Sequence, residues 1–249
     1  MSYCERTGII TPEDDKKIWR YMSFEKFVSL LEERALFFVR SNKFRDTYEG
    51  MFPKKTQERV FRSDNPPEIN QLNREFFMKH RESITINCWH MNEFESAAMW
   101  DLYINNSQGI AIQSTISDLK NSFRETEGKI YIGQILYLDY TKDDIGVGYG
   151  DGYSQYLRKR KSFEHEREVR VIYNLKNPFL MLNPSGGNGI SSPNDIGVSI
   201  KCDIECLINK IYVSPESGEW FVNLVKAICK KYGLESEVIK SNLYDKQLY

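Results

Sequence analysis

The segment FEHEREVRVIY, residues 163–173, holds the residues whose types and spacing best suit chemistry. If the segment is a strand, alternate residues share one face, and that face carries Glu164, Glu166, Glu168 and Arg170. Two carboxylates on one face can stabilise a developing cation, or one can activate a nucleophile while the other holds a sugar hydroxyl. The alternative is an ion-pair ladder that keeps the strand in register. We expect Glu166 and Glu168 to be catalytic.

Two cations near these glutamates are expected to act with them. Arg170 is the predicted partner that keeps the acidic pair charged, and Lys159 belongs to the basic segment YLRKRK just before it. A third cation, Arg20, interrupts the apolar-aromatic segment IWRYM. Because Trp19 and Tyr21 share one face of that strand, Arg20 points to the other, where its guanidinium can capture phosphate or carboxylate. The alternative is a solvated or structural arginine.

The polar segment RSNKFRDTYEG, which begins at Arg40, is a second candidate for ligand binding. It is either a ligand loop or a turn in which Asp46 and Glu49 cap nearby amides. A nuclease reading would group Asp46 with Glu166 and Glu168 around Mg²⁺, since acidic side chains in a sheet can hold that ion.

A third candidate is the segment NCWHMNEFESAAMWDLY, which offers Cys88 and Trp89 at a strand end. Trp100 and Tyr103 follow with helical spacing, which is typical of a core. Aromatic rings beside polar residues also suit stacking on a flat ligand ring. Cys88 and His90 project from the same strand face, so a thiol–imidazole dyad is a further alternative.

Periodicity places these residues on alternating strands and helices. The order strand, helix, strand occurs twice in the first half, and Gly233 follows the clearest helix as its expected stop. We predict an α+β fold with a mixed, mostly antiparallel central sheet flanked by helices. The expected strands cover residues 18–22, 35–39, 84–90, 109–115, 129–140, 163–173, 210–215 and 236–240, and the expected helices begin at residue 24 and cover 67–80, 95–103, 153–161 and 217–232.

Composition indicates one globular domain over residues 1–249, with 41% hydrophobic and 13% aromatic residues. Residues 1–17 are expected to be an N-terminal extension, and 183–197 a flexible loop. The net charge of −1 excludes binding of polyanions by bulk attraction. No apolar run reaches the roughly 20 residues that span a bilayer, so we expect no membrane partner.

Five cysteines without a disulfide-like pattern favour a reducing, cytoplasmic setting. Cys202 and Cys206 lie four residues apart, but the three histidines are scattered, so no metal site is expected.

Several of these segments together resemble a large bacterial and archaeal family that carries only a domain-of-unknown-function label. Its pattern is similar to F-x-D-x-x-E-G, then M-W-x-x-Y with G-[IV]-x-I, then K-x-x-[WF]-x-x-E-x-E-x-R. Here the pattern falls on Phe44, Asp46, Glu49 and Gly50, on Met99, Trp100, Tyr103, Gly109, Ile110 and Ile112, and on Lys159 or nearby, Phe163, Glu166, Glu168 and Arg170.

The order of parts also resembles that of ADP-ribosyltransferases. The resemblance matches Arg20 to their first-strand cation, Cys88 to their small polar position, and Glu166 with Glu168 to their acidic pair. It implies that Arg20 orders the ribose or phosphates of NAD and that Glu168 accepts the ribose 2′-hydroxyl. It further implies that Glu166 orients the nucleophile and that Trp89 or Tyr103 stacks on nicotinamide. The usual Ser-Thr-Ser is replaced here by Asn87-Cys88-Trp89.

The leading expectation is therefore an NAD-using ADP-ribosyltransferase-like enzyme or NAD hydrolase, in toxin or anti-phage defence. Its target would be a protein or a nucleic acid. The alternative is a non-catalytic sensory module that binds nucleic acid or another ligand, with RSNKFR and YLRKRK as polyanion contacts.

Overall fold

The computed structural model describes residues 2–104, 108–145, 152–175 and 196–245. Within these residues, nine strands form one sheet in the order β11-β10-β4-β1-β3-β2-β9, with β8 added to β3 and β5 to β8. Only the β10–β11 pair of this sheet is parallel in the described part, which confirms the predicted α+β class. The strands are β1 (Lys17–Ser23), β2 (Ala35–Arg40), β3 (Ile84–Met91), β4 (Gly109–Thr115), β5 (Ile130–Gln134), β8 (Glu168–Asn174), β9 (Gly197–Lys201), β10 (Lys210–Val213) and β11 (Glu237–Lys240).

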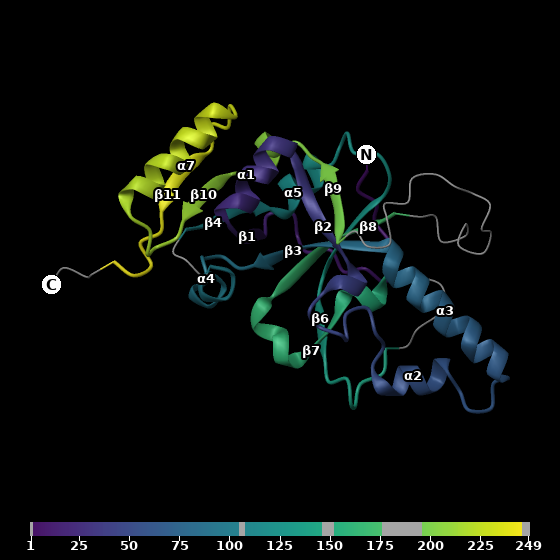
Figure 1. Ribbon diagram of the computed structural model, residues 1–249. Coiled ribbons are helices and arrows are strands. Elements are labelled where there is room, and N and C mark those ends of the chain that lie inside the picture. Colours follow the sequence, from purple (N-terminus) through teal and green to yellow (C-terminus); the bar gives the residue numbers. More distant parts are fainter. Residues whose placement is uncertain (1, 105–107, 146–151, 176–195, 246–249) are drawn as a thin grey trace.

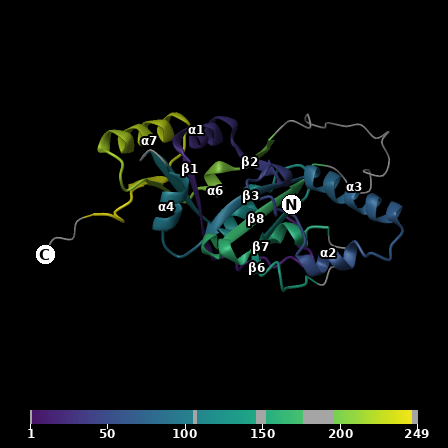
Figure 2. The ribbon, with the colours of Figure 1, turned by 60° about the horizontal axis from the view of Figure 1, so that its bottom comes forward.

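Helices cover both faces of the sheet and its ends. The largest hydrophobic cluster joins α1, α5, α6 and α7 to one face, and a smaller cluster packs α4 against β1 and β4 on the other. Figure 2 shows α1 and α7 on one side and α4 on the other, and Figure 1 shows α2 and α3 at the end opposite α7. The helices are α1 (Phe24–Glu33), α2 (Lys54–Val60), α3 (Pro67–Ser83), α4 (Ala97–Tyr103), α5 (Ile116–Ser122), α6 (Ile204–Leu207) and α7 (Glu219–Lys231).

The sheet is split between β1 and β2. β8 pairs along one edge of β3 from Ile84 to His90, so β1 and β2 must share the other edge. β1 pairs with the last two residues of β3, and β2 pairs near its start, at Thr85 and Ile86. Residues 87–89 therefore have no backbone partner on that edge among the described strands. Side chains enter this gap instead, and Asn87 donates a hydrogen bond to the Phe37 carbonyl at 2.9 Å.

The region before β8 differs from the prediction. The helix predicted for residues 153–161 is reduced to a 3-10 helix, η2 (Ser154–Leu157), because β7 (Arg158–Arg160) pairs in parallel with β6 (Leu136–Leu138) in a small second sheet. A 3-10 helix, η3 (Lys161–Glu166), follows, and it ends at Arg167, whose φ of 40° is left-handed. The strand predicted for residues 163–173 thus begins only at Glu168. The pairing of β7 with β6 and the left-handed backbone of Arg167 prevent the longer strand that the alternating sequence pattern predicted.

The helical spacing of residues 217–232 predicts a buried side of Trp220, Phe221, Leu224, Val225 and Ile228. In α7, Phe221 and Val225 are buried together with Val222 and Cys229, whereas Trp220 and Leu224 are 60% and 37% exposed. On α3, the face of Ile69, Leu72 and Phe76 is exposed. The neighbouring ring of Phe77 faces α2 and contacts Phe52, with ring centroids 5.0 Å apart.

The segment before β1 packs along β5, since Ser2 and Ile10 accept backbone hydrogen bonds from Ile130 and Gln134. Residues 183–195 of the loop predicted to be flexible lie outside the described part of the chain. No helix within the described ranges is both long and apolar enough to cross a membrane.

Candidate functional site

A cavity of about 700 Å³ opens where the sheet splits between β1 and β2. Its wall combines α1, β1, β2, β3, the end of α4 and the turn from η3 into β8. This volume lies within the roughly 300–1,000 Å³ typical of small-molecule sites. Six of the predicted site residues line it, namely Arg20, Cys88, Trp89, Tyr103, Glu166 and Glu168.

Four predicted substrate-binding residues do not line the cavity. Arg40 donates a hydrogen bond to the Glu82 carbonyl at 3.4 Å, near the start of β3. Trp100 is buried, and its indole Nε1 donates to the Glu95 carboxylate at 2.9 Å. Lys159 and Arg170 are buried partners of the glutamates, as described below. In these positions the four residues contact other parts of the protein, outside the cavity wall.

Arg20 reaches into the split, where its Nη1 donates a hydrogen bond to the Cys88 carbonyl at 2.5 Å. The guanidinium forms no ion pair with any acidic side chain in the described ranges. Burial lowers its pKa, because the charged form loses solvent. A partly satisfied cation in a cavity wall is a natural contact for an anionic ligand.

Glu168 is held by two fixed cations. Its Oε1 accepts a hydrogen bond from Arg170 Nε at 3.1 Å, and its Oε2 accepts from Arg170 Nη2 at 3.1 Å and from Lys159 Nζ at 3.2 Å. Burial alone would raise the pKa of Glu168, but Arg170 and Lys159 outweigh it and lower that pKa from 4.5 to about 2. Glu168 is therefore ionised, with few lone pairs left for a ligand.

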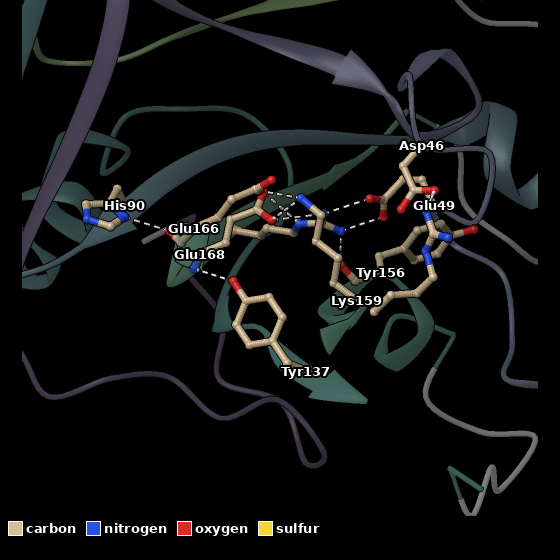
Figure 3. A network of polar contacts seen from close by, with 10 residues as sticks. Asp46, Glu49, His90, Tyr137, Tyr156, Lys159, Glu166 and Glu168 are labelled. Atoms are coloured by element: carbon tan, nitrogen blue, oxygen red, sulfur yellow. Dashed lines mark hydrogen bonds and ion pairs between the residues drawn. The ribbon is translucent and has the colours of Figure 1, made fainter. Parts of the chain in front are cut away.

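Arg170 is in turn anchored by Glu49. Its Nη1 and Nη2 donate to the two carboxylate oxygens of Glu49 at 2.5 and 2.7 Å, and Nη1 also donates to the Tyr156 carbonyl at 2.6 Å. Figure 3 shows this network running from the glutamates of β8 and η3 to Glu49. Asp46 is bound separately, by Arg160 at 2.9 Å. The acids of RSNKFRDTYEG are thus counterions of buried or half-buried arginines.

Glu166 has a different position from Glu168. Its Oε2 accepts a hydrogen bond from Lys159 Nζ at 2.5 Å, whereas its Oε1 has no hydrogen-bond partner among the residues the structure describes. Lys159 is 8% exposed, and although burial would lower its pKa, the charges of Glu168 and Glu166 raise it. Glu166 thus offers a charged, positioned oxygen at the cavity wall.

Cys88 is unsuited to act as a nucleophile. Burial raises the pKa of its thiol well above the ordinary value, and the Glu168 carboxylate raises it further. The thiol therefore stays protonated at neutral pH. The expected partner of a dyad, His90, uses its Nδ1 to bind the Glu166 carbonyl at 2.7 Å. The protonated thiol argues against the alternative of a Cys88–His90 dyad.

Sequence reasoning missed the structural role of Tyr137, whose hydroxyl accepts a hydrogen bond from the Glu168 backbone amide at 2.8 Å. No local signal marks this residue, because the contact depends on the second sheet. Asp46, bound by Arg160, does not join the two glutamates as the nuclease reading required. In the described ranges, no group of three His, Cys, Asp or Glu residues is arranged to hold a metal ion.

Comparison of the chain with family models, curated proteins and solved structures found no match.

Proposed function

We propose that this protein binds NAD in the cavity at the split and cleaves the bond between nicotinamide and ribose. The observation that carries the proposal is the convergence of three groups on one cavity. They are the guanidinium of Arg20, which forms no ion pair with the described residues, the Glu166 Oε1, which accepts no hydrogen bond from them, and the ring of Tyr103. These groups come from β1, the η3–β8 turn and α4, which lie far apart in the sequence.

Each group matches a part of the ligand. Arg20 would bind the pyrophosphate, because a guanidinium matches the geometry of phosphate oxygens. Glu166 Oε1 would accept a ribose hydroxyl hydrogen bond and stabilise the positive charge that develops on the ribose carbon. Tyr103 is 44% exposed at the cavity wall and can stack on the nicotinamide ring. Glu168 then serves to fix Lys159 and so to position Glu166.

The reaction is a substitution at the ribose carbon. The carbon–nitrogen bond breaks, and its electron pair leaves with neutral nicotinamide. The oxygen of water or of a target then bonds to the same carbon and loses its proton. Transfer to water makes the protein an NAD hydrolase, and transfer to a macromolecule makes it an ADP-ribosyltransferase. Either activity would suit a toxin or an anti-phage effector.

The test incubates the protein with NAD labelled in the adenosine part and measures nicotinamide release and label transfer. The wild type should release nicotinamide, and Glu166→Gln should reduce the rate at least about a hundredfold, as expected for loss of a charge at the reacting centre. Glu164→Gln is the matched control, because Glu164 is exposed on the same 3-10 helix. Equal rates for Glu166→Gln and the control would contradict the proposal.

A second candidate function is ligand binding without catalysis, and the saturation of Glu168 by Lys159 and Arg170 favours it. This reading predicts that NAD binds without nicotinamide release. A nucleic-acid version has less support, since Lys159 and Arg160 of the basic segment are paired with acids inside the protein.

A further inference from the structure

His90 is a buried imidazole in the cavity wall with one nitrogen unused. The side chain is 3% exposed, belongs to the cavity wall and lies on β3 where that strand pairs with Trp19 of β1. Its Nδ1 lies 2.7 Å from the Glu166 carbonyl oxygen. Because a carbonyl can only accept a hydrogen bond, Nδ1 must carry the proton. The second nitrogen, Nε2, is buried and has no partner in the part of the chain that the structure describes.

The surroundings keep this imidazole neutral. Burial lowers the pKa of His90 from 6.5, the charges of Arg167 and His165 lower it further, and the hydrogen bond to the Glu166 carbonyl opposes them. His90 of β3 lies opposite Glu168 of β8, and the Glu168 carboxylate is ion-paired with Lys159 and Arg170. From β1, the ring of Tyr21 meets it edge-on, with ring centroids 6.3 Å apart. At neutral pH, Nε2 therefore carries a free lone pair.

We propose that His90 Nε2 is the general base that takes the proton from an O–H nucleophile as its oxygen attacks the ribose carbon. This inference rests on the proposed function and specifies the acceptor class as water or an alcohol. The oxygen–carbon bond forms, the carbon–nitrogen bond breaks with its electrons leaving on nicotinamide, and the proton passes to Nε2. The imidazolium then returns its proton to solvent.

The two glutamates are less suited to this task. Both oxygens of Glu168 accept hydrogen bonds from Arg170 or Lys159, and one oxygen of Glu166 is bound by the same Lys159 while the proposed function assigns the other to the ribose. The neutral imidazole of His90 keeps an unshared lone pair on Nε2 at neutral pH, which is what a general base requires. The arrangement thus divides the work, with Glu166 stabilising positive charge and His90 removing a proton.

The test is His90→Asn, because the asparagine amide can replace Nδ1 as donor to the Glu166 carbonyl while no group replaces Nε2. The general-base role predicts that kcat for nicotinamide release falls about 10²–10⁴-fold while KM changes little. It also predicts that the acidic limb of the wild-type kcat profile, which lies below pH 6.5, disappears. A purely structural role predicts wild-type kcat and an unchanged pH profile, which would overturn the inference.

Two further measurements cover the remaining outcomes. Nitrogen-15 NMR of the wild type reports the tautomer directly, and a protonated Nε2 with a bare Nδ1 would overturn the inference without any assay of activity. Added methanol distinguishes the two acceptors, since methyl ADP-ribose forms only if an alcohol can replace water. A wild type that releases no nicotinamide contradicts the proposed function itself, whereas an active wild type with an equally active His90→Asn variant contradicts only the role of His90.

Discussion

Glu168 should make the stability of the protein depend on pH in a defined window. Its carboxylate is ionised between Arg170 and Lys159, and its pKa falls from 4.5 to about 2, which corresponds to about 3 kcal/mol of stability. Removing one partner from a buried ion pair costs a similar amount, about 3–5 kcal/mol. Glu168→Gln should therefore lower the free energy of unfolding by about 3–5 kcal/mol at pH 7.

The sign of the pH effect follows from the lowered pKa. Between pH 4.5 and about 2, the unfolded carboxyl takes up a proton and the folded one does not. The contribution is therefore complete above pH 4.5 and is lost as the pH falls toward 2. The difference in stability between wild type and Glu168→Gln should shrink by about 2 kcal/mol from pH 6 to pH 3.

Urea denaturation followed by tryptophan fluorescence, repeated at each pH, measures this difference. The comparison with Glu168→Gln cancels the titration of groups that lie far from Glu168. Glu164→Gln, at an exposed position, should stay within about 0.5 kcal/mol of the wild type at every pH. A difference below about 1 kcal/mol at pH 7, or one that does not change between pH 6 and pH 3, would refute the reasoning.

Three further predictions concern the backbone and the thiol at the site. Arg167, at φ 40°, should tolerate glycine within about 1 kcal/mol of unfolding free energy, whereas Arg167→Val should cost about 1–2 kcal/mol or more; equal effects would contradict a left-handed requirement. Gly50→Ala should destabilise the protein more than Gly233→Ala by at least about 1 kcal/mol, because an added Cβ at Gly50 would lie 2.5 Å from the Tyr156 ring while Gly233 has open space. Both glycines have positive φ, so the difference in thermal stability between the two variants measures the clash at Gly50. Cys88 should resist alkylation by iodoacetamide at pH 7.5 in the folded protein and react in urea, since burial raises the pKa of its thiol. Equal rates of Cys88 alkylation with and without urea, measured by mass spectrometry, would contradict this.

The strands that carry the site were readable from the sequence because their signals are local. The apolar run around Arg20, the strand ending near Cys88 and the aromatic spacing of α4 each follow from a short pattern, and each element forms where it was expected. The sequence order also placed Arg20, Cys88, Glu166 and Glu168 on elements that meet at one cavity.

What the sequence did not reveal depends on contacts between distant segments. The sequence predicts Lys159 within a basic helix, yet pairing of β7 with β6 buries it beside two glutamates. Arg167 gives no residue-type signal for a left-handed conformation, so Glu166 and Glu168 were expected on one strand face rather than on either side of a turn. Arg170 pairs with Glu168, as expected, but it also pairs with Glu49, 121 residues away. Local periodicity cannot report such a pairing.

The most direct test of the central claim is the binding of NAD to Arg20, which reaches into the split and forms no ion pair with the described part of the chain. Isothermal titration calorimetry should show that wild-type protein binds NAD and that Arg20→Met weakens Kd about 10–150-fold, the loss of about 1.5–3 kcal/mol expected for a hydrogen bond to a charged group. Lys161→Met removes an exposed charge that does not line the cavity and should leave Kd unchanged. If folded Arg20→Met binds NAD as tightly as the wild type, or if the wild type does not bind it, the assignment of this cavity is wrong.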